Sequence, residues 1–176
     1  MKKLALASAV LLFTATFSYA KDAPRHFVMG GIRNTSNRVG LGFNTQLSRF
    51  GVDSISLRSW TSDRLGFEGL FGFLLGDNTQ CIDLGGKILF GIKTDRILHL
   101  YGFGLLGMEN WSAKTSGVET HDTDVTVGGG FGVEFFFQGM PDLGFGTEIG
   151  LGYNSGTKQF GTLASWIPTV GMRYYF

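Results

Sequence analysis

Hydrophobic and polar residues alternate along most of this chain with a period of two. The last seven residues, 170–176, place Val, Met, Tyr and Phe on one side and Gly, Arg and Tyr on the other. Successive side chains of a β-strand point to opposite faces, so this pattern predicts a strand with one bulky apolar face and one smaller, more polar face. The alternation, interrupted at regular intervals by turn residues, predicts eight strands: Arg38–Leu47, Ile55–Trp60, Arg64–Leu75, Ile82–Thr94, Ile97–Trp111, Thr123–Gln138, Leu143–Asn154 and Leu163–Phe176.

The connectors between the predicted strands alternate in length. Three are tight, namely Thr61–Asp63, Asp95–Arg96 and Gly139–Asp142. The other four are longer, namely Ser48–Ser54, Gly76–Cys81, Ser112–Asp122 and Ser155–Thr162. Short turns at one end and longer loops at the other are typical of outer-membrane β-barrels, in which the short turns are periplasmic. An even number of strands then places both ends of the barrel at the short-turn side.

The two faces of the predicted strands favour a membrane barrel over a soluble one. In the sixth strand, Phe131, Val133 and Phe135 share one face, whereas Gly132 and Glu134 share the other. A soluble barrel should turn a charged face to water, but here the second face is mostly glycine. Eight strands leave an interior just wide enough for side chains, so small residues suit the lumen and bulky ones suit lipid. We therefore predict an all-β fold, an eight-stranded antiparallel up-and-down transmembrane β-barrel over residues 38–176.

The first residues have the features of an export signal. Lys2 and Lys3 precede an apolar run, Leu4–Phe17, that is too short for a spanning helix. Small residues at Ser18 and Ala20 favour cleavage after residue 20, so we predict a signal peptide over residues 1–20. An uncleaved anchor is the alternative. We interpret residues 21–37 as a periplasmic N-terminal tail, although they could also extend the first strand.

Composition narrows the class further. All 28 glycines follow residue 20. The glycine fraction of the chain after the predicted signal peptide is therefore well above the usual level of about 7%. Without Lys2 and Lys3, 13 basic residues face 14 acidic ones, and this balance gives no reason to expect nucleic-acid binding. Cys81 is the single cysteine, so an intramolecular disulfide is excluded and we interpret it as a bystander.

Charged residues of both signs fall on the glycine-rich, inward face. Two nearby carboxylates are costly in a low dielectric unless cations reach them. We expect Arg173 beside Glu134 and Glu148, with Lys87 reaching them across the lumen. Three interpretations stay open: a structural network, which we favour, a narrow or gated ion path, and a catalytic carboxylate dyad. The predicted network is Arg58 with its diagonal neighbour Glu68, Lys87, Glu134, Glu148 and Arg173, and Lys93 lies nearer the short turns.

Aromatic residues are expected at both membrane interfaces, where amphipathic rings gather. We place Trp111, Tyr153 and Trp166 on the outward face near the longer loops, and Tyr174 at the opposite end. Trp60 is an exception, because it has the inward parity of Arg58. Either the strand twists at its end or the register slips there.

Other candidate chemistry is weak. His121, Asp122 and Asp124 could hold a divalent cation, but their spacing matches no calcium loop, so we favour a solvated polar loop. His99 lacks the His-x-Ser pattern of lipid-modifying barrels, and no Gly-x-Ser-x-Gly motif is present. We predict no catalytic residue, no cofactor and no metal.

The segment Ile55–Gly69 resembles an element of a known superfamily, a strand ending in an aromatic residue, a tight turn and a strand with an inward Glu. With it, residues 38–176 resemble the eight-stranded outer-membrane β-barrels, the family of the transmembrane domain of outer-membrane protein A. The terminal Phe176, with Tyr174 and Met172, resembles the signal by which such barrels are recognised for assembly.

That resemblance implies the outer membrane of a Gram-negative bacterium as the location. We predict a structural role, with a lumen closed by the charge network. The alternatives are a narrow passive channel for small ions or solutes and a lipid-modifying outer-membrane enzyme. Outer-membrane lipid and lipopolysaccharide, the barrel-assembly machinery and periplasmic chaperones are the implied partners of a monomer. Fold does not decide among these functions.

Overall fold

The computed structural model describes residues 38–46, 54–95, 97–115, 118–137, 139–163 and 169–176. Our predictions for residues 1–37 and for Trp166 lie outside the described residues. Within the described part of the chain, no helix is long and apolar enough to cross a membrane. The strands described are β1 (Arg38–Asn44), β2 (Ser54–Trp60), β3 (Leu65–Leu75), β4 (Thr79–Thr94), β5 (Leu98–Thr115), β6 (Val118–Phe137), β7 (Met140–Asn154), β8 (Gln159–Thr162) and β9 (Thr169–Tyr175).

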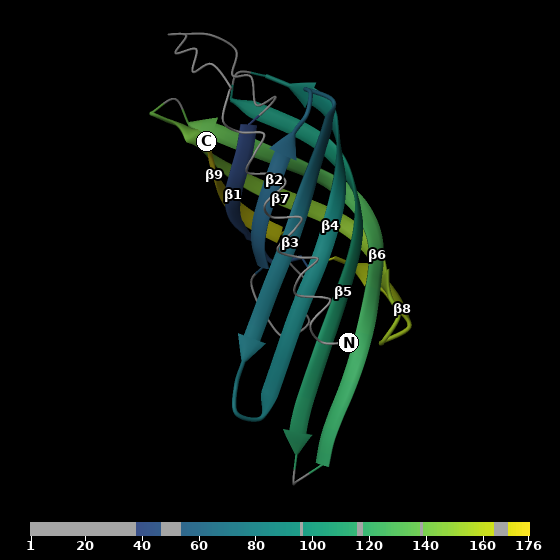
Figure 1. The fold of residues 1–176 in the computed structure, drawn as a ribbon. Helices are drawn as coiled ribbons and strands as arrows, with labels where there is room; N and C mark the ends of the chain where they lie inside the picture. The colour runs from purple at the N-terminus through teal and green to yellow at the C-terminus, as the bar shows by residue number, and fades with distance from the viewer. Residues whose placement is uncertain (1–37, 47–53, 96, 116–117, 138, 164–168) are drawn as a thin grey trace.

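These strands form one closed antiparallel barrel (Figure 1). Each strand from β1 to β7 pairs with the next, β7 pairs with β9, and β9 pairs back with β1. The predicted all-β barrel of eight strands is therefore confirmed. Of the predicted last strand, Leu163–Phe176, the structure describes β9, and residues 164–168 lie outside the described residues. The short β8 falls in the predicted connector Ser155–Thr162 and pairs with the outer part of β7.

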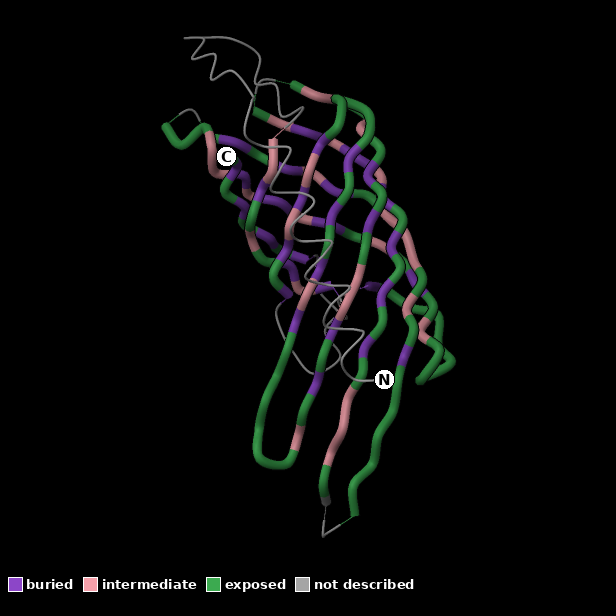
Figure 2. Tube along the Cα trace, viewed as in Figure 1, coloured by how far each residue is buried: buried purple, intermediate pink, exposed green. Residues whose placement is uncertain are grey.

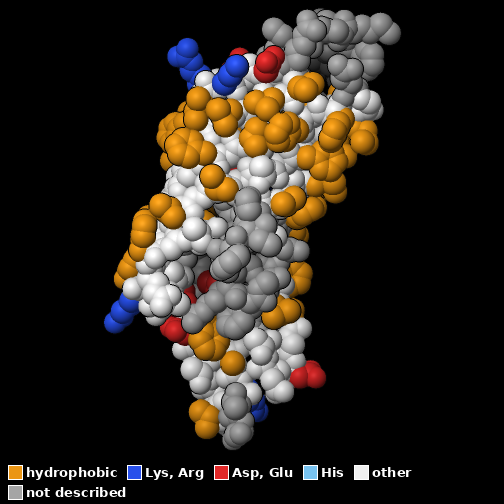
Figure 3. Space-filling view, turned by 180° about the vertical axis from the view of Figure 1, so that it is seen from behind, with side chains coloured by type: hydrophobic (Ala, Val, Ile, Leu, Met, Phe, Trp, Pro, Cys, Tyr) orange, Lys and Arg blue, Asp and Glu red, His pale blue; other side chains and the backbone are white. Residues whose placement is uncertain are grey.

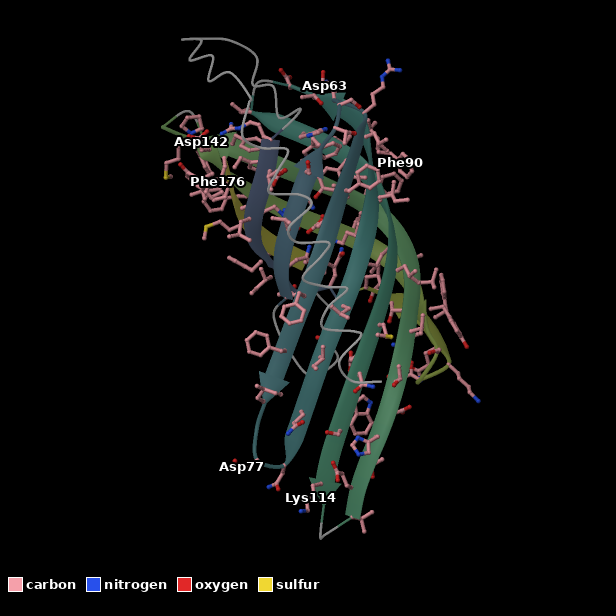
Figure 4. All side chains as sticks on the ribbon, viewed as in Figure 1. Asp63, Asp77, Phe90, Lys114, Asp142 and Phe176 are labelled. Carbon is pink, nitrogen blue, oxygen red and sulfur yellow. The ribbon has the colours of Figure 1, made fainter. Side chains whose placement is uncertain are left out.

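Where the structure describes them, the tight turns and the longer connectors lie at opposite ends of the barrel. In Figure 4, Asp63 and Asp142, beside two of the tight turns, lie at one end with Phe176, and Asp77 and Lys114 lie at the other. Both ends of the described barrel, β1 and β9, reach the side of the short turns, as the even strand count predicts. In the following paragraphs, "outer" means the end of Asp77 and Lys114.

The β5–β6 hairpin is longer than predicted. Residues 112–122 were expected to form a loop, but Ser112 pairs with His121 and Thr115 with Val118. The hairpin projects beyond the barrel body at the outer end (Figure 1). A strand with water on both sides needs no apolar face, so its sequence shows no alternation that could have predicted it.

The alternation of burial along the strands follows the predicted alternation of side chains (Figure 2). Phe131 is 61% exposed and Ile149 is 59% exposed, whereas Glu134 and Glu148 on the same strands are buried. Apolar side chains cover much of the wall in Figure 3, and the visible charged side chains lie mainly toward its two ends. Such an arrangement, apolar outside and polar within, is that of a barrel in lipid.

Candidate functional site: a charged network in the lumen

The structure brings all six predicted lumen charges together inside the barrel. Each comes from a different strand, and each is at most 3% exposed. Inward side chains meet in this way because an eight-stranded barrel is only wide enough to be filled by them. The six residues are Arg58 on β2, Glu68 on β3, Lys87 on β4, Glu134 on β6, Glu148 on β7 and Arg173 on β9.

Arg58 is the hub of this lumen network. Its Nη2 lies 2.6 Å from Glu68 Oε2 and 2.6 Å from Glu148 Oε1, and its Nη1 lies 3.5 Å from Glu134 Oε2. One guanidinium therefore touches carboxylates from three strands. The planar fork of arginine suits it to such multiple contacts.

The other two cations complete the pairing. Arg173 Nη2 lies 2.7 Å from Glu68 Oε1, and its Nη1 lies 3.4 Å from Glu134 Oε1. Lys87 Nζ lies 2.6 Å from Glu148 Oε2 and 3.5 Å from Glu68 Oε2. Three cations thus face three carboxylates, so the network is neutral and each carboxylate has at least two cationic neighbours.

Two details of the predicted pairing were wrong. Arg58 and Glu68 are directly opposite each other in the β2–β3 ladder rather than diagonal. Lys87 faces Glu68 from the other side, in the β3–β4 ladder. Glu148 is paired with Arg58 and Lys87 and not, among the described ion pairs, with Arg173. The long arginine side chains reach across the lumen, which pairing rules for neighbouring strands do not anticipate.

Neutral polar side chains donate further hydrogen bonds to the three carboxylates. The Tyr101 hydroxyl donates to Glu148 Oε1 at 2.6 Å, and the Tyr175 hydroxyl donates to Glu134 Oε2 at 2.7 Å. Ser56 Oγ donates to Glu68 at 2.5 Å, and Asn44 Nδ2 donates to Glu148 at 3.3 Å. Sequence reasoning missed these four residues, although Ser56 and Tyr175 have the inward parity of Arg58 and Arg173.

A largely apolar layer of buried side chains lies in the lumen on the side of the short turns. Its members lie two residues further along their strands from Arg58, Lys87, Tyr101, Glu134 and Arg173, in the direction of those turns. Aromatic contacts join part of the layer, because the Trp60 ring lies 4.1 Å from that of His99 and the Phe136 ring lies 5.7 Å from that of Tyr175, centroid to centroid. The layer consists of Trp60, Leu89, His99, Phe136 and Tyr175, all at most 6% exposed.

The inward position of Trp60 resolves the exception noted in the sequence. Its parity with Arg58 is real, and no register slip occurs, because Trp60 pairs with Gly66 in the same ladder in which Arg58 pairs with Glu68. A Cβ on Gly66 would lie 2.7 Å from the Trp60 ring, so the absence of a side chain there makes room for the indole.

A small gap lies beside the network in the described lumen. The gap beside it has about 0 Å³ available to a water molecule, and its lining residues are Asn44, Gly146, Glu148, Thr169, Gly171 and Arg173. The arrangement can therefore hold charge in place, but between these residues it offers no room for a substrate.

Two residues differ from their predicted positions. Lys93 is exposed instead of inward, because a bulge between Gly91 and Lys93 shifts the register of β4 against β5. Trp111 shares the inward parity of the buried Glu109 and Leu105, so it does not lie on the lipid-facing side. Apolar residues occupy both faces of β5, which removes the contrast on which the sequence assignment depended.

The other aromatic and terminal residues lie on the outward face. Tyr153 is 46% exposed near the outer end of β7, and Tyr174 is 49% exposed near the short turns. Phe176 and Met172 share the face of Tyr174, and the rings of Tyr174 and Phe176 lie 5.1 Å apart. Their role as an assembly signal stays a prediction.

The polar segment around His121 is a strand rather than a loop. Asp122 and Asp124 share one parity of β6 and His121 has the other, so the three side chains do not converge. His121 is exposed and lies 3.2 Å from Glu119, whereas Asp124 is buried.

Comparison with known proteins identifies solved structures that share this fold. No family model matches the chain, and no curated protein matches it. The N-terminal β-barrel domain of OprF from Pseudomonas aeruginosa matches with a TM-score of 0.63 at 12% identity, over 82% of this chain and 100% of that domain. Neisserial surface protein A gives 0.47 at 15% identity, and Ail of Yersinia pestis gives 0.43 at 13%, each over 79% of this chain and 94% of its own. The chain has the fold of the eight-stranded outer-membrane β-barrels.

Proposed function

We propose that the protein is a structural barrel of the outer membrane of a Gram-negative bacterium, with a lumen closed by its charge network and no chemistry of its own. The lumen network of Arg58, Glu68, Lys87, Glu134, Glu148 and Arg173 is the observation that carries this proposal. Ionisable groups inside membrane proteins face the interior and pair with one another, as these six do.

The outer wall supports the membrane location. Large apolar side chains such as Phe90, Leu106 and Val127 are more than half exposed, and exposing them to water would be unfavourable. Outer-membrane lipid, including lipopolysaccharide, is the environment that would cover them. The barrel acts as a monomer, and the assembly machinery and periplasmic chaperones are its partners during biogenesis.

The lumen network supports a closed barrel because opening a path would separate several ion pairs at once. A conducting path past Arg58 would have to part it from Glu68 and from Glu148, both at 2.6 Å. Removing one partner of a buried pair leaves an uncompensated charge, which is strongly unfavourable. The layer around Trp60 adds a second obstruction on the side of the short turns.

The same contacts support the absence of catalysis. A general acid or base needs reach to a substrate atom, but the carboxylates of Glu134 and Glu148 are already held by cations and tyrosine hydroxyls. The gap beside Glu148 is too small for a water molecule.

The test is conductance of the refolded protein in a planar bilayer. Wild-type protein that is demonstrably folded, as judged by its heat-modifiable mobility in gels, should be silent. Glu148→Ala should introduce fluctuating leak currents, because it removes the 2.6 Å ion pairs that Glu148 makes with Arg58 and with Lys87. Glu119→Ala is the matched control, since Glu119 is exposed at the outer end and should leave the bilayer silent. Discrete wild-type steps that change with Glu148→Ala would instead favour the narrow channel for small ions.

A further inference from the structure

A second group of buried acidic side chains lies in the lumen on the outer side of the network. Asp83 on β4 is directly opposite Glu109 on β5, and Glu109 is directly opposite Asp124 on β6. Their exposures are 1%, 6% and 1%. Like charges opposite each other destabilise a sheet, so this row gains from a cation between its members.

Cys81 adds a sulfur ligand to this row. It lies two residues from Asp83 on the same face of β4 and is buried, and its Sγ donates to Asp83 Oδ1 at 3.2 Å. One potential ligand atom from each of Cys81, Asp83 and Glu109 lies within 4.8 Å of the other two. Metal ligands about 2.0–2.3 Å from a common zinc ion are separated by distances of this order.

An independent observation comes from the neighbouring strands. Ser54 on β2 is 1% exposed, and its Oγ has no hydrogen-bond partner among the described residues. The second carboxylate oxygen of Asp83, Oδ2, has none there either. Both atoms face the same point above Gly72, because a Cβ built on Gly72 would lie 3.1 Å from Ser54 Oγ and 3.2 Å from Asp83 Oδ2. A buried hydroxyl and a buried carboxylate oxygen, both without a hydrogen-bond partner among the described residues, therefore lie next to the glycine.

We propose that Cys81, Asp83 and Glu109 bind a divalent transition-metal ion of the zinc type in the outer part of the lumen. Thiolate together with carboxylate is a ligand set that zinc accepts, whereas calcium and magnesium take oxygen ligands alone. Ser54 Oγ and Asp83 Oδ2 lie where they can hydrogen-bond or complete the coordination. On binding, the metal ion takes the place of the thiol proton of Cys81, and that proton leaves to solvent.

The site is distinct from the lumen network. Asp83 is four residues from Lys87 on β4, which is about 13 Å along a strand. The proposed site therefore adds a metal-dependent brace between β4 and β5 toward the outer end of the barrel. Metal binding at this place would stabilise the barrel without opening it.

The experiment is titration of the full refolded protein, first stripped with a chelator, with Zn²⁺ by calorimetry and with Co²⁺ by absorption. Wild-type protein should bind one Zn²⁺, release a proton, and show a thiolate-to-cobalt charge-transfer band in the near ultraviolet. Cys81→Ser should abolish the band, and Cys81→Ser and Asp83→Asn should each weaken Zn²⁺ binding by more than about 10-fold, since even supporting residues around a metal contribute that much.

His121→Ala is the matched control, because His121 and Glu119 form an exposed pair that could bind zinc adventitiously. Binding lost in His121→Ala but kept in Cys81→Ser would overturn the proposal. So would wild-type protein that binds no metal, or one that binds Ca²⁺ equally well before and after Cys81→Ser. The cobalt band is measured on the wild-type protein alone. Its absence would therefore contradict the proposal even if a variant failed to fold.

Discussion

Arg58 and Glu148 meet across the lumen with their Nη2 and Oε1 atoms 2.6 Å apart, although their strands, β2 and β7, are separated in the barrel wall by β1 and β9. Lys87 reaches the other oxygen of the same carboxylate from β4 at 2.6 Å. Glu148 on β7 therefore links β2 and β4 to β7, and no two of these three strands pair directly with each other. The lumen network therefore links strands on different sides of the barrel wall.

Replacing Glu148 should destabilise the barrel strongly. Glu148→Ala leaves Arg58 and Lys87 buried with fewer partners, and breaking a buried ion pair costs about 3–5 kcal/mol. The same loss is expected for Glu68→Ala, since Glu68 contacts all three cations. The measurement is the free energy of unfolding by urea in lipid vesicles, compared with the exposed Glu119→Ala. Unchanged midpoints for both lumen variants would exclude an energetic role for the network.

The inward glycines should be required because a larger side chain would collide with residues in the lumen. Comparing an inward glycine with an outward one separates this packing effect from the effect of glycine on the backbone. A Cβ on Gly132 would lie 2.5 Å from the Tyr101 ring, whereas a Cβ on Gly104 has nothing within 4 Å. Gly132→Ala should therefore cost about 1–3 kcal/mol through overpacking. Gly104→Ala on the outward face should be neutral or stabilise by about 0.4–1 kcal/mol through the unfolded chain. Equal unfolding free energies for the two variants would contradict the packing argument.

Much of the barrel and of its charged interior could be predicted from the sequence, because one physical constraint acts on every membrane strand. Lipid outside and a crowded lumen inside force the two faces of a strand such as β6 to differ, as Phe131 and Glu134 do. The alternation then identifies both the strand and the inward charges. This inference from alternation holds where one face of the strand meets only lipid and the other meets only the lumen.

The predictions were wrong where that constraint is absent. The outer parts of β5 and β6 project beyond the barrel body (Figure 1), and residues 118–123 are exposed without alternation, so Ser112 and His121 gave no sign that they pair. On β5 both faces are apolar, so the inward parity of Trp111 could not be recognised. The bulge that exposes Lys93 depends on how β4 meets β5, which the sequence of either strand alone does not specify. The convergence of Cys81 with Glu109 likewise depends on register between strands.

A charge on the lipid-facing wall should be penalised according to its depth. Phe131 lies six residues from the end of β6 at the short turn, which is about half of a 25 Å apolar band for a strand tilted by about 45°. Phe131→Arg should therefore cost about 2–4 kcal/mol in lipid vesicles, and Val118→Arg, at the tip of the projecting hairpin, about 0–1 kcal/mol. Equal costs at both positions, measured by urea unfolding in vesicles, would place the membrane elsewhere on the barrel.

Phe176 should matter for assembly in the cell and hardly at all for the folded barrel. Its side chain is 66% exposed, and its backbone is held instead, because its N–H donates to Val39 at 2.9 Å and its carbonyl accepts from Arg38 Nε at 3.3 Å. Phe176→Ala keeps both backbone contacts, so refolding into vesicles and unfolding free energy should stay within about 0.5 kcal/mol of wild type.

In cells, the same Phe176→Ala variant should reach the outer membrane in a clearly smaller amount, measured by fractionation and heat-modifiable mobility. Phe160→Ala is the control, since Phe160 is also an exposed phenylalanine, 70% exposed on β8 at the outer end. A loss shared by both variants would mean a general effect of removing apolar surface. A loss of stability in vesicles with Phe176→Ala would mean that the terminal ring packs against the barrel. Only a loss confined to Phe176→Ala in cells identifies the ring as a signal, because assembly machinery reads a position in the chain whereas lipid responds to apolar area alone.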